Sequence, residues 1–262
     1  MIAGISTASL FMRLETKDAL PLFDEWNVPQ TEVFLTSFCE YEPRFAKAVA
    51  PKKGNVAVHS VHTLTTQFEP QLYSAHPRVR QDAFRILDKA LKSANAFGAR
   101  YYTFHGVARI KRTSVEDLER WGLLTAQIAE YCAERGVTLC LENVEWAMYN
   151  RPGVFRALKR YCPALKGVLD VKQARVSGNS YEKYLEEMGE DITHVHVCDH
   201  TETGKNCLPG QGTFDFDGLF SELKQIGFRG PVLIENYGRD YADLGMLKRA
   251  FEYLAEKAYK FS

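Results

Sequence analysis

The chain has 262 residues, of which 45% are hydrophobic and 25% are charged. This composition is typical of a soluble globular protein and excludes a disordered or collagen-like chain. Lysine plus arginine balance aspartate plus glutamate at 33 each, so the net charge is zero. Proteins that bind nucleic acid through phosphate contacts usually carry a basic surplus, so nucleic acid is a disfavoured partner.

The cysteines and the apolar segments indicate the compartment. The six cysteines are scattered without a CxxC pair, which favours a reducing cytoplasm. The opening MIAGISTASLFM is apolar but too short to cross a bilayer, and we interpret it as the first strand. No other stretch approaches a membrane span, so we expect a cytoplasmic protein with no membrane partner.

Short apolar runs with strand character alternate along the chain with segments of helical period, such as 79–97 and 118–132. The runs are IAGIS (2–6), EVFL (32–35), VAVH (56–59), RYYTFH (100–105), VTLCLE (137–142), GVLD (167–170), THVHV (193–197) and VLIE (232–235). This alternation predicts an α/β fold, a single (β/α)8 TIM barrel, with an open doubly wound sheet as the main competitor. No linker interrupts it, so we expect one domain over 1–262.

The chemistry of such a barrel lies at the carboxyl ends of its strands. Side chains alternate along a strand, so the residue that ends each predicted strand can be assigned to the axis or to the helices. Ionisable residues that this alternation directs to the axis at one rim are His59, His105, Glu142, Asp170, His196 and Glu235. His194 is expected one layer deeper, in the barrel core.

Carboxylates gathered at one rim would repel one another as bare charges, which raises their pKa values or recruits a cation. Carboxylate oxygens with one imidazole suit Mn²⁺, Mg²⁺, Co²⁺ or Zn²⁺, and adding His59 and His105 favours Zn²⁺ or a two-metal centre. Each residue alone also has a structural interpretation, as a helix cap, a loop salt-bridge partner or a core histidine. Their common position in the strand register favours a site.

These residues lie in motifs that resemble the xylose isomerase-like TIM-barrel superfamily, which includes sugar isomerases and epimerases, inosose dehydratases and endonuclease IV. The motifs are AVHSVH (57–62), YYTFHG (101–106), LCLENVEW (139–146), GVLDVKQA (167–174), THVHVCD (193–199), LPGQGTFDF (208–216) and VLIEN (232–236). The resemblance implies a metal held by Glu142, Asp170, His196 and Glu235. It also implies that His59 and His105 bind substrate or a second metal, and that the chain forms a homo-oligomer.

The sequence departs from endonuclease IV where that enzyme binds its third zinc. It reads Asp170-Val-Lys-Gln173 and Gly204-Lys205-Asn206 at the positions of those ligands. We therefore expect a divalent-metal-dependent isomerase or epimerase of a sugar or sugar phosphate, with Glu142 and Glu235 as general base and acid beside the carbonyl. The alternatives are a phosphodiesterase for abasic-site DNA, a dehydratase of the inosose type and a ligand-binding barrel without activity.

Two long loops, 60–74 and 198–212, could close over the rim. His62 and Lys205 within these loops, together with Trp146 and Gln173, are candidates for substrate contact, although ordinary loop solvation or barrel packing would explain each of them. The basic residues Arg109, Lys111 and Arg112 could bind a phosphate, or form a solvated loop. The sequence does not distinguish epimerisation, isomerisation and dehydration.

Overall fold

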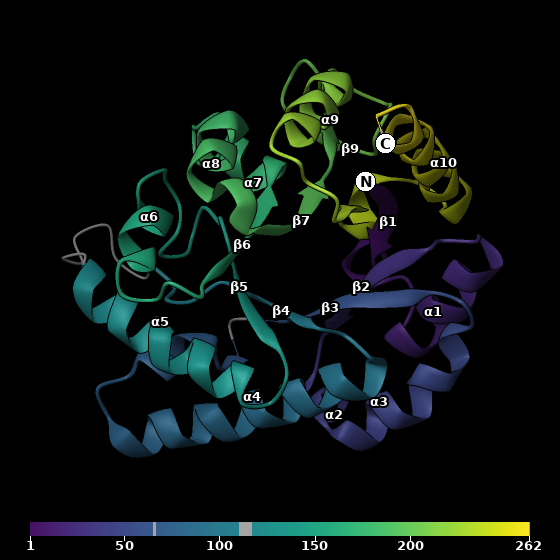
Figure 1. Ribbon diagram of the computed structural model, residues 1–262. Coiled ribbons are helices and arrows are strands. Elements are labelled where there is room, and N and C mark those ends of the chain that lie inside the picture. Colours follow the sequence, from purple (N-terminus) through teal and green to yellow (C-terminus); the bar gives the residue numbers. More distant parts are fainter. Residues whose placement is uncertain (65–66, 110–116, 262) are drawn as a thin grey trace.

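The computed structural model describes residues 1–64, 67–109 and 117–261, in which eight parallel strands form a closed barrel surrounded by helices (Figure 1). The strands are β1 (Ile2–Ser6), β2 (Gln30–Leu35), β3 (Ala57–Thr63), β4 (Tyr101–Phe104), β5 (Thr138–Glu142), β6 (Lys166–Asp170), β7 (Ile192–Val197) and β10 (Pro231–Ile234). Around the barrel their order is β1-β10-β7-β6-β5-β4-β3-β2. The predicted (β/α)8 fold is confirmed, and each predicted run overlaps one barrel strand; the single domain over 1–262 stays a prediction.

Helices cover the outside of the barrel. They are α1 (Thr16–Glu25), α2 (Phe38–Tyr41), α3 (Pro43–Val49), α4 (Pro77–Phe97), α5 (Leu118–Ala133), α6 (Val154–Lys159), α7 (Val171–Val176), α8 (Tyr181–Met188), α9 (Phe216–Gln225) and α10 (Leu244–Lys260). The longest, α4, buries a stripe that includes Ala83, Leu87 and Leu91 and ends at Gly98. Gly98 has a φ of 80°, the left-handed conformation that glycine adopts most readily, and this turn leads into β4.

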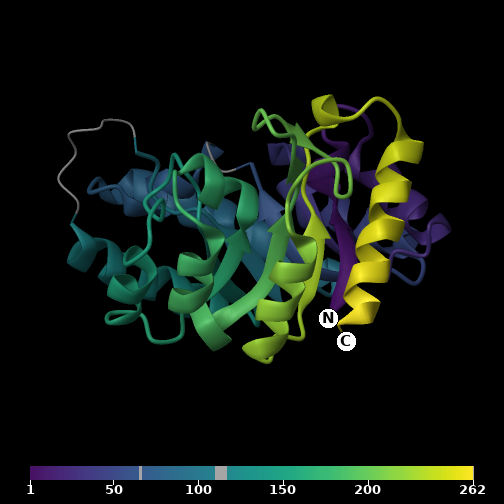
Figure 2. The ribbon, with the colours of Figure 1, turned by 90° about the horizontal axis from the view of Figure 1, so that it is seen from above.

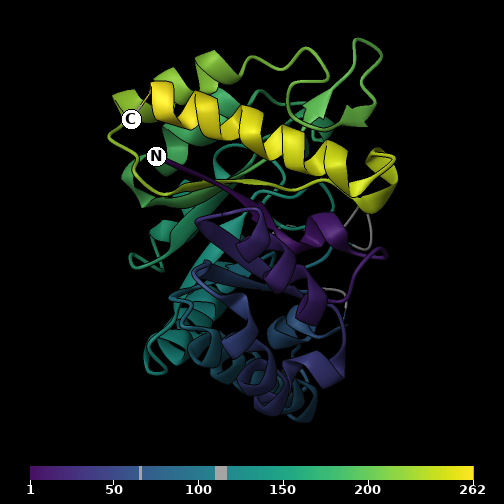
Figure 3. The same ribbon diagram turned by 90° about the vertical axis from the view of Figure 1, so that its right-hand side faces the viewer.

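Both chain termini lie on one side of the barrel, and the loops that follow the carboxyl ends of the strands lie on the other (Figure 2). The last helix, α10, runs along the outside of β1 (Figure 3). After β7 the chain forms a small antiparallel hairpin of β8 (Asp199–His200) and β9 (Asn206–Cys207). In the described part of the chain, no helix is both long and apolar enough to cross a membrane.

Candidate active site

Four predicted ligands meet at the carboxyl ends of four strands. Glu142 ends β5, Asp170 ends β6, His196 lies on β7 and Glu235 directly follows β10. Each is at most 6% exposed, and each offers one ligand atom within 4.8 Å of those of the other three. Strand alternation and sequence motif therefore selected residues that the fold brings together.

The imidazole of His196 lies between these carboxylates. Its Nδ1 atom is 2.8 Å from Oε1 of Glu142 and 3.1 Å from Oε2 of Glu235. Burial alone would lower the pKa of His196, but the carboxylates of Glu235, Glu32 and Glu142 raise it well above its ordinary value. A cation bound at Nδ1 would have to displace a proton, so binding would depend on pH.

Asp170 occupies the turn between β6 and α7. Its Oδ1 atom accepts a hydrogen bond of 2.7 Å from the backbone N–H of Gln173, so it caps α7 as well as facing the site. Asn143 fixes the same turn, because its side chain exchanges two hydrogen bonds of 2.8 Å with the backbone of Asp170. Burial, with the nearby carboxylates of Glu142 and Glu235, raises the pKa of Asp170 to about 6, against the opposing effect of Lys172. A cation would remove this repulsion.

The residues present fit a divalent cation. One oxygen of Glu235, Oε2, is buried without a hydrogen-bond partner among the described residues, and such an atom is costly unless a ligand satisfies it. Three carboxylates and one imidazole form the donor set of sites for Mn²⁺, Zn²⁺, Co²⁺ or Mg²⁺.

Glu32, which sequence reasoning missed, lies at the centre of the buried polar cluster. It is fully buried on β2, accepts a 2.8 Å hydrogen bond from the Ser60 hydroxyl, and lies 3.2 Å from Nε2 of His194 and 3.0 Å from Nε2 of His196. Burial favours the neutral acid, but His196 and His194 outweigh burial and hold the pKa of Glu32 well below its usual range. Glu32 is therefore a buried anion behind His196. As predicted, His194 lies in the barrel core.

A second group of potential ligands adjoins the first. Nε2 of His105 is 2.9 Å from Oε2 of Glu142 and 3.1 Å from Nε2 of His62, and these three residues could hold another cation. Glu69, in the 3-10 helix Glu69–Tyr73, accepts a 3.0 Å hydrogen bond from the backbone N–H of His105. Although burial opposes protonation, Glu142 and Glu69 raise the pKa of His105 to about 10.

The prediction that His59 lies at this rim is wrong. The strand register shifts at His59, because Thr31 of β2 pairs with Val58 while Glu32 pairs with Ser60. This bulge adds one residue to β3 and changes the alternation after it, so that His62 reaches the site.

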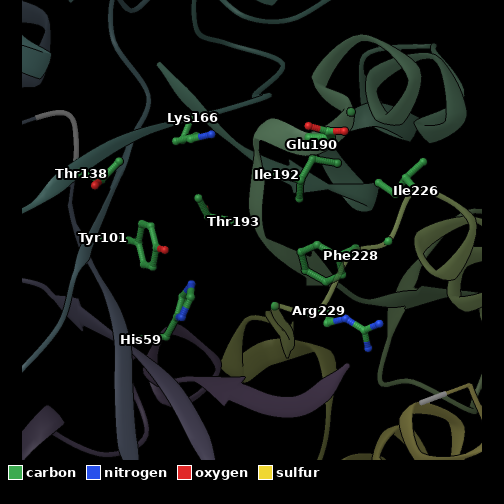
Figure 4. Close-up of a pocket in the computed structure, with 13 residues that line it drawn as sticks. His59, Tyr101, Thr138, Lys166, Glu190, Ile192, Thr193, Ile226, Phe228 and Arg229 are labelled. Carbon is green, nitrogen blue, oxygen red and sulfur yellow. The ribbon is translucent and has the colours of Figure 1, made fainter. Parts of the chain in front are cut away.

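His59 instead lines a 550 Å³ pocket at the amino ends of the strands (Figure 4). Other residues around that pocket are Tyr101, Thr138, Lys166, Ile192 and Arg229. The ring of His59 stacks on Tyr101 with centroids 4.6 Å apart, so this histidine belongs to the opposite mouth of the barrel.

The other candidates for substrate contact differ in position. Trp146 is half-buried and stacks on His105 with ring centroids 5.5 Å apart, so it lies beside the site. The side chain of Gln173 accepts a 3.2 Å hydrogen bond from the backbone of Glu145. Lys205 is exposed in the connection between β8 and β9.

The first predicted loop and the basic run lie partly outside the described residues. Residues 65 and 66 of the first loop, and Lys111 and Arg112 of the basic run, lie outside the described residues. Arg109 is described, and its backbone N–H donates a 2.8 Å hydrogen bond to the carbonyl of Trp146.

A sequence profile of the xylose isomerase-like TIM barrel family matches residues 25–257. The chain belongs to this family. Among curated proteins, it is 27% identical over 227 residues to L-ribulose-5-phosphate 3-epimerase UlaE of Escherichia coli, covering 84% of this chain and 79% of that protein.

Solved structures show the same xylose isomerase-like fold. D-psicose 3-epimerase from Clostridium cellulolyticum H10, solved with D-tagatose, superposes with a TM-score of 0.80 at 18% identity, covering 100% of this chain and 99% of that one. The IOLI protein with a bound zinc atom superposes with a TM-score of 0.79 at 16% identity, covering 100% of this chain and 98% of that one. At these identities the likeness establishes the fold.

Lys172 is a further residue of this xylose isomerase-like site that the sequence did not single out. It is 6% exposed at the start of α7, with its Nζ atom 3.6 Å from Oδ2 of Asp170 and 4.9 Å from the centroid of the Tyr237 ring. The helix that carries Lys172, α7, is only six residues long. So short a helix has no hydrophobic periodicity from which the direction of the lysine side chain could be predicted.

Proposed function

We propose that the protein is a divalent-metal-dependent sugar epimerase or isomerase that moves a proton on the carbon beside a ketose carbonyl. One observation carries the proposal: Glu142 of β5 and Glu235 after β10, two strands that β6 and β7 separate in the barrel, both approach Nδ1 of His196, at 2.8 and 3.1 Å. Epimerisation needs one group to remove a proton and another to return one on the opposite face of the carbon. The epimerases among its relatives support this class of reaction.

The two glutamates have different surroundings. Oε2 of Glu235 lies 3.1 Å from Nδ1 of His196 but makes no hydrogen bond among residues 1–64, 67–109 and 117–261, so Glu235 is the less engaged of the two glutamates. Both oxygens of Glu142 already lie within 3 Å of an imidazole nitrogen, one from His105 and one from His196. We assign Glu235 as the first base and Glu142 as the group that returns the proton.

Glu142, Asp170, His196 and Glu235 would hold the cation. When bound, it would act as a Lewis acid towards the carbonyl and hydroxyl oxygens of the substrate. His62 and His105 would hold a substrate hydroxyl or a second cation, and Trp146 would pack on the sugar. Gln173 and Lys205 are weaker candidates for substrate contact, because Gln173 is bonded to the backbone and Lys205 is exposed.

The substrate would be a ketose or ketose phosphate. The test is whether the substrate proton exchanges with solvent. Proton NMR in D₂O would monitor this exchange with Mn²⁺-loaded protein and L-ribulose 5-phosphate, D-psicose or D-tagatose. Glu235→Gln should slow exchange by at least about 1,000-fold, because it removes the base while keeping the shape of the side chain. The mechanism would be rejected if Glu235→Gln exchanged the proton of a substrate of the wild type at the wild-type rate.

A metal phosphodiesterase is the second candidate, favoured by the adjoining group of His62, His105 and Glu142. Cleavage of abasic-site DNA by the zinc-loaded protein, with three tightly bound zinc ions, would support it. One or two metals and no cleavage would favour the epimerase.

A further inference from the structure

Lys172 is a buried cation with a loose ion-pair partner. Its side chain is 6% exposed, and Oδ2 of Asp170 lies 3.6 Å from its ammonium, beyond ordinary hydrogen-bond distance. An ammonium carries three donors, and burying them without acceptors costs free energy. Such a group is therefore more consistent with a site that awaits a ligand than with a structural ion pair.

The single carboxylate within 4 Å of this ammonium, among the described residues, is Asp170 at 3.6 Å. Exposed ion pairs of the same chain are closer, as between Lys89 and Glu42 at 2.6 Å and between Lys257 and Asp217 at 2.9 Å. Asp170, the partner of Lys172 in this ion pair, is also a proposed metal ligand. A cation bound to Asp170 would take up its charge and leave the Lys172 ammonium to another acceptor.

The position of Lys172 is set by the fold. Asp170, at the end of β6, caps α7, and Lys172 is the second residue of that helix. Its ammonium also faces the ring of Tyr237, which follows β10, and β7 lies between β6 and β10 in the barrel. The ammonium therefore lies between Asp170, at the end of β6, and Tyr237, two residues after Glu235.

A pocket lies beside the proposed metal site. Lys172 lines this 330 Å³ pocket together with Arg175, Cys198 and His200, whereas the four proposed metal ligands are not part of its lining. The guanidinium of Arg175 is already bonded to the backbone oxygen of Gly204 at 3.0 Å and to the Asn206 side chain at 2.6 Å. Arg175 is therefore held by two acceptors of the β8–β9 hairpin, whereas the nearest carboxylate oxygen to the Lys172 ammonium is 3.6 Å away.

We propose that Lys172 is a catalytic residue whose ammonium donates a hydrogen bond to the substrate oxygen that becomes negative when the neighbouring C–H proton is removed. This inference rests on the proposed function. Removal of that proton by Glu235 leaves the electron pair shared between carbon and the carbonyl oxygen, giving an enediolate. A fixed ammonium beside this oxygen stabilises the charge more in the transition state than in the ground state. No proton needs to leave Lys172.

The first experiment compares proton exchange by Lys172→Met, Lys172→Arg and the wild type, all loaded with Mn²⁺, on the three ketoses named above. We expect kcat to fall about 100- to 1,000-fold in Lys172→Met with KM changed less than about threefold, and Lys172→Arg to keep about a tenth of the rate. Lys166→Met is the matched control, because Lys166 lies at the opposite end of β6 and pairs with Asp191 at 2.8 Å. It should exchange like the wild type.

The second experiment does not depend on turnover. Calorimetry measures the affinity for Mn²⁺ alone, and then for acetohydroxamate, a planar anionic mimic of an enediolate, added to the Mn²⁺-loaded protein. Lys172→Met should bind Mn²⁺ at least as tightly as the wild type, because a competing cation beside Asp170 is gone. It should bind acetohydroxamate at least about tenfold more weakly.

Three results would overturn the proposal. If excess Mn²⁺ restores full activity to Lys172→Met, the lysine only supports the metal site. If the variant loses affinity for the phosphorylated ketose alone, with kcat intact, the lysine anchors a phosphate. If the wild type exchanges none of the ketoses, the proposed function fails, but equal acetohydroxamate binding by wild type and Lys172→Met would still refute the role of Lys172.

Discussion

The Nε2 atom of His196 lies 3.0 Å from Oε1 of Glu32, on the opposite side of the imidazole from Glu142 and Glu235. A carboxylate behind a ligating histidine fixes which ring nitrogen carries the proton and makes the other nitrogen a better ligand. The two atoms are an ion pair without hydrogen-bond geometry, so Glu32 would favour a proton on Nε2 through its charge and leave Nδ1 to the cation. This relationship gives a buried residue of β2 a role in a site built from other strands.

Glu32→Gln should weaken metal binding by about 10- to 100-fold, because the amide keeps the shape but loses the charge behind His196. Titration of metal-free protein with Zn²⁺ or Mn²⁺ in a calorimeter measures this change. The control is Glu40→Gln, since Glu40 is also buried but accepts its hydrogen bonds from Thr36. Equal metal affinity in Glu32→Gln and the wild type would exclude the orienting role.

Removing divalent cations with a chelator should lower Tm by roughly 5–10 °C relative to protein with a hundredfold excess of metal over its Kd. The physical reason is that Glu142, Asp170 and Glu235 lie buried together, and a cation that binds only the folded state relieves their repulsion. Differential scanning calorimetry with chelator, and after Mn²⁺ or Zn²⁺ is restored, measures the shift. The Tm of the double variant Asp170→Asn, Glu235→Gln should change neither with chelator nor with added metal. If its Tm shifts as in the wild type, the metal binds elsewhere.

The ends of the strands could be predicted from the sequence because alternation is local. Glu142, Asp170 and Glu235 each follow a short apolar run. Counting residues along that run shows whether each side chain points to the barrel axis or to the helices. Glu32 was missed because a charged residue at the start of an apolar run gives no sign that it is buried. The sequence pattern places His62 in a loop, because the bulge at His59 depends on pairing between β2 and β3, which periodicity does not reveal. Glu69 reaches His105 from a loop helix, far from any strand pattern.

Asp199→Asn should disorder the loop after β7 and lower the free energy of unfolding by about 1–3 kcal/mol. The Asp199 carboxylate accepts four backbone hydrogen bonds, from His200 at 2.7 Å, Gly210 at 3.1 Å, Gly212 at 2.8 Å and Phe214 at 2.9 Å. An asparagine amide has only one accepting oxygen, so some of these N–H groups would lose their partner.

Urea unfolding measures the stability change in Asp199→Asn, and limited proteolysis reports on the loop. Asp215→Asn is the matched control, because Asp215 caps α9 through a 2.9 Å hydrogen bond from Gly218 and asparagine caps helices equally well. If the two variants are equally stable and equally resistant to protease, the carboxylate of Asp199 does not order the loop.

The histidine at the far mouth of the barrel predicts a pH dependence of stability. Burial, with His194 nearby, lowers the pKa of His59 from 6.5 to about 3. Between pH 3 and 6.5 the unfolded chain therefore binds a proton at this position that the folded protein does not. The contribution of His59 to the free energy of unfolding should rise with pH through that window, by up to a few kcal/mol, and stay constant above it.

His59→Gln removes this titration, so the free energy of unfolding should depend less steeply on pH than in the wild type across the same window. Urea unfolding at a series of pH values measures both slopes. His76→Gln is the control, because His76 is exposed at the start of α4 and its replacement should leave the slope unchanged. A slope in His59→Gln equal to that of the wild type would show that His59 is readily protonated in the folded protein, and the pocket around it would then have to be solvated.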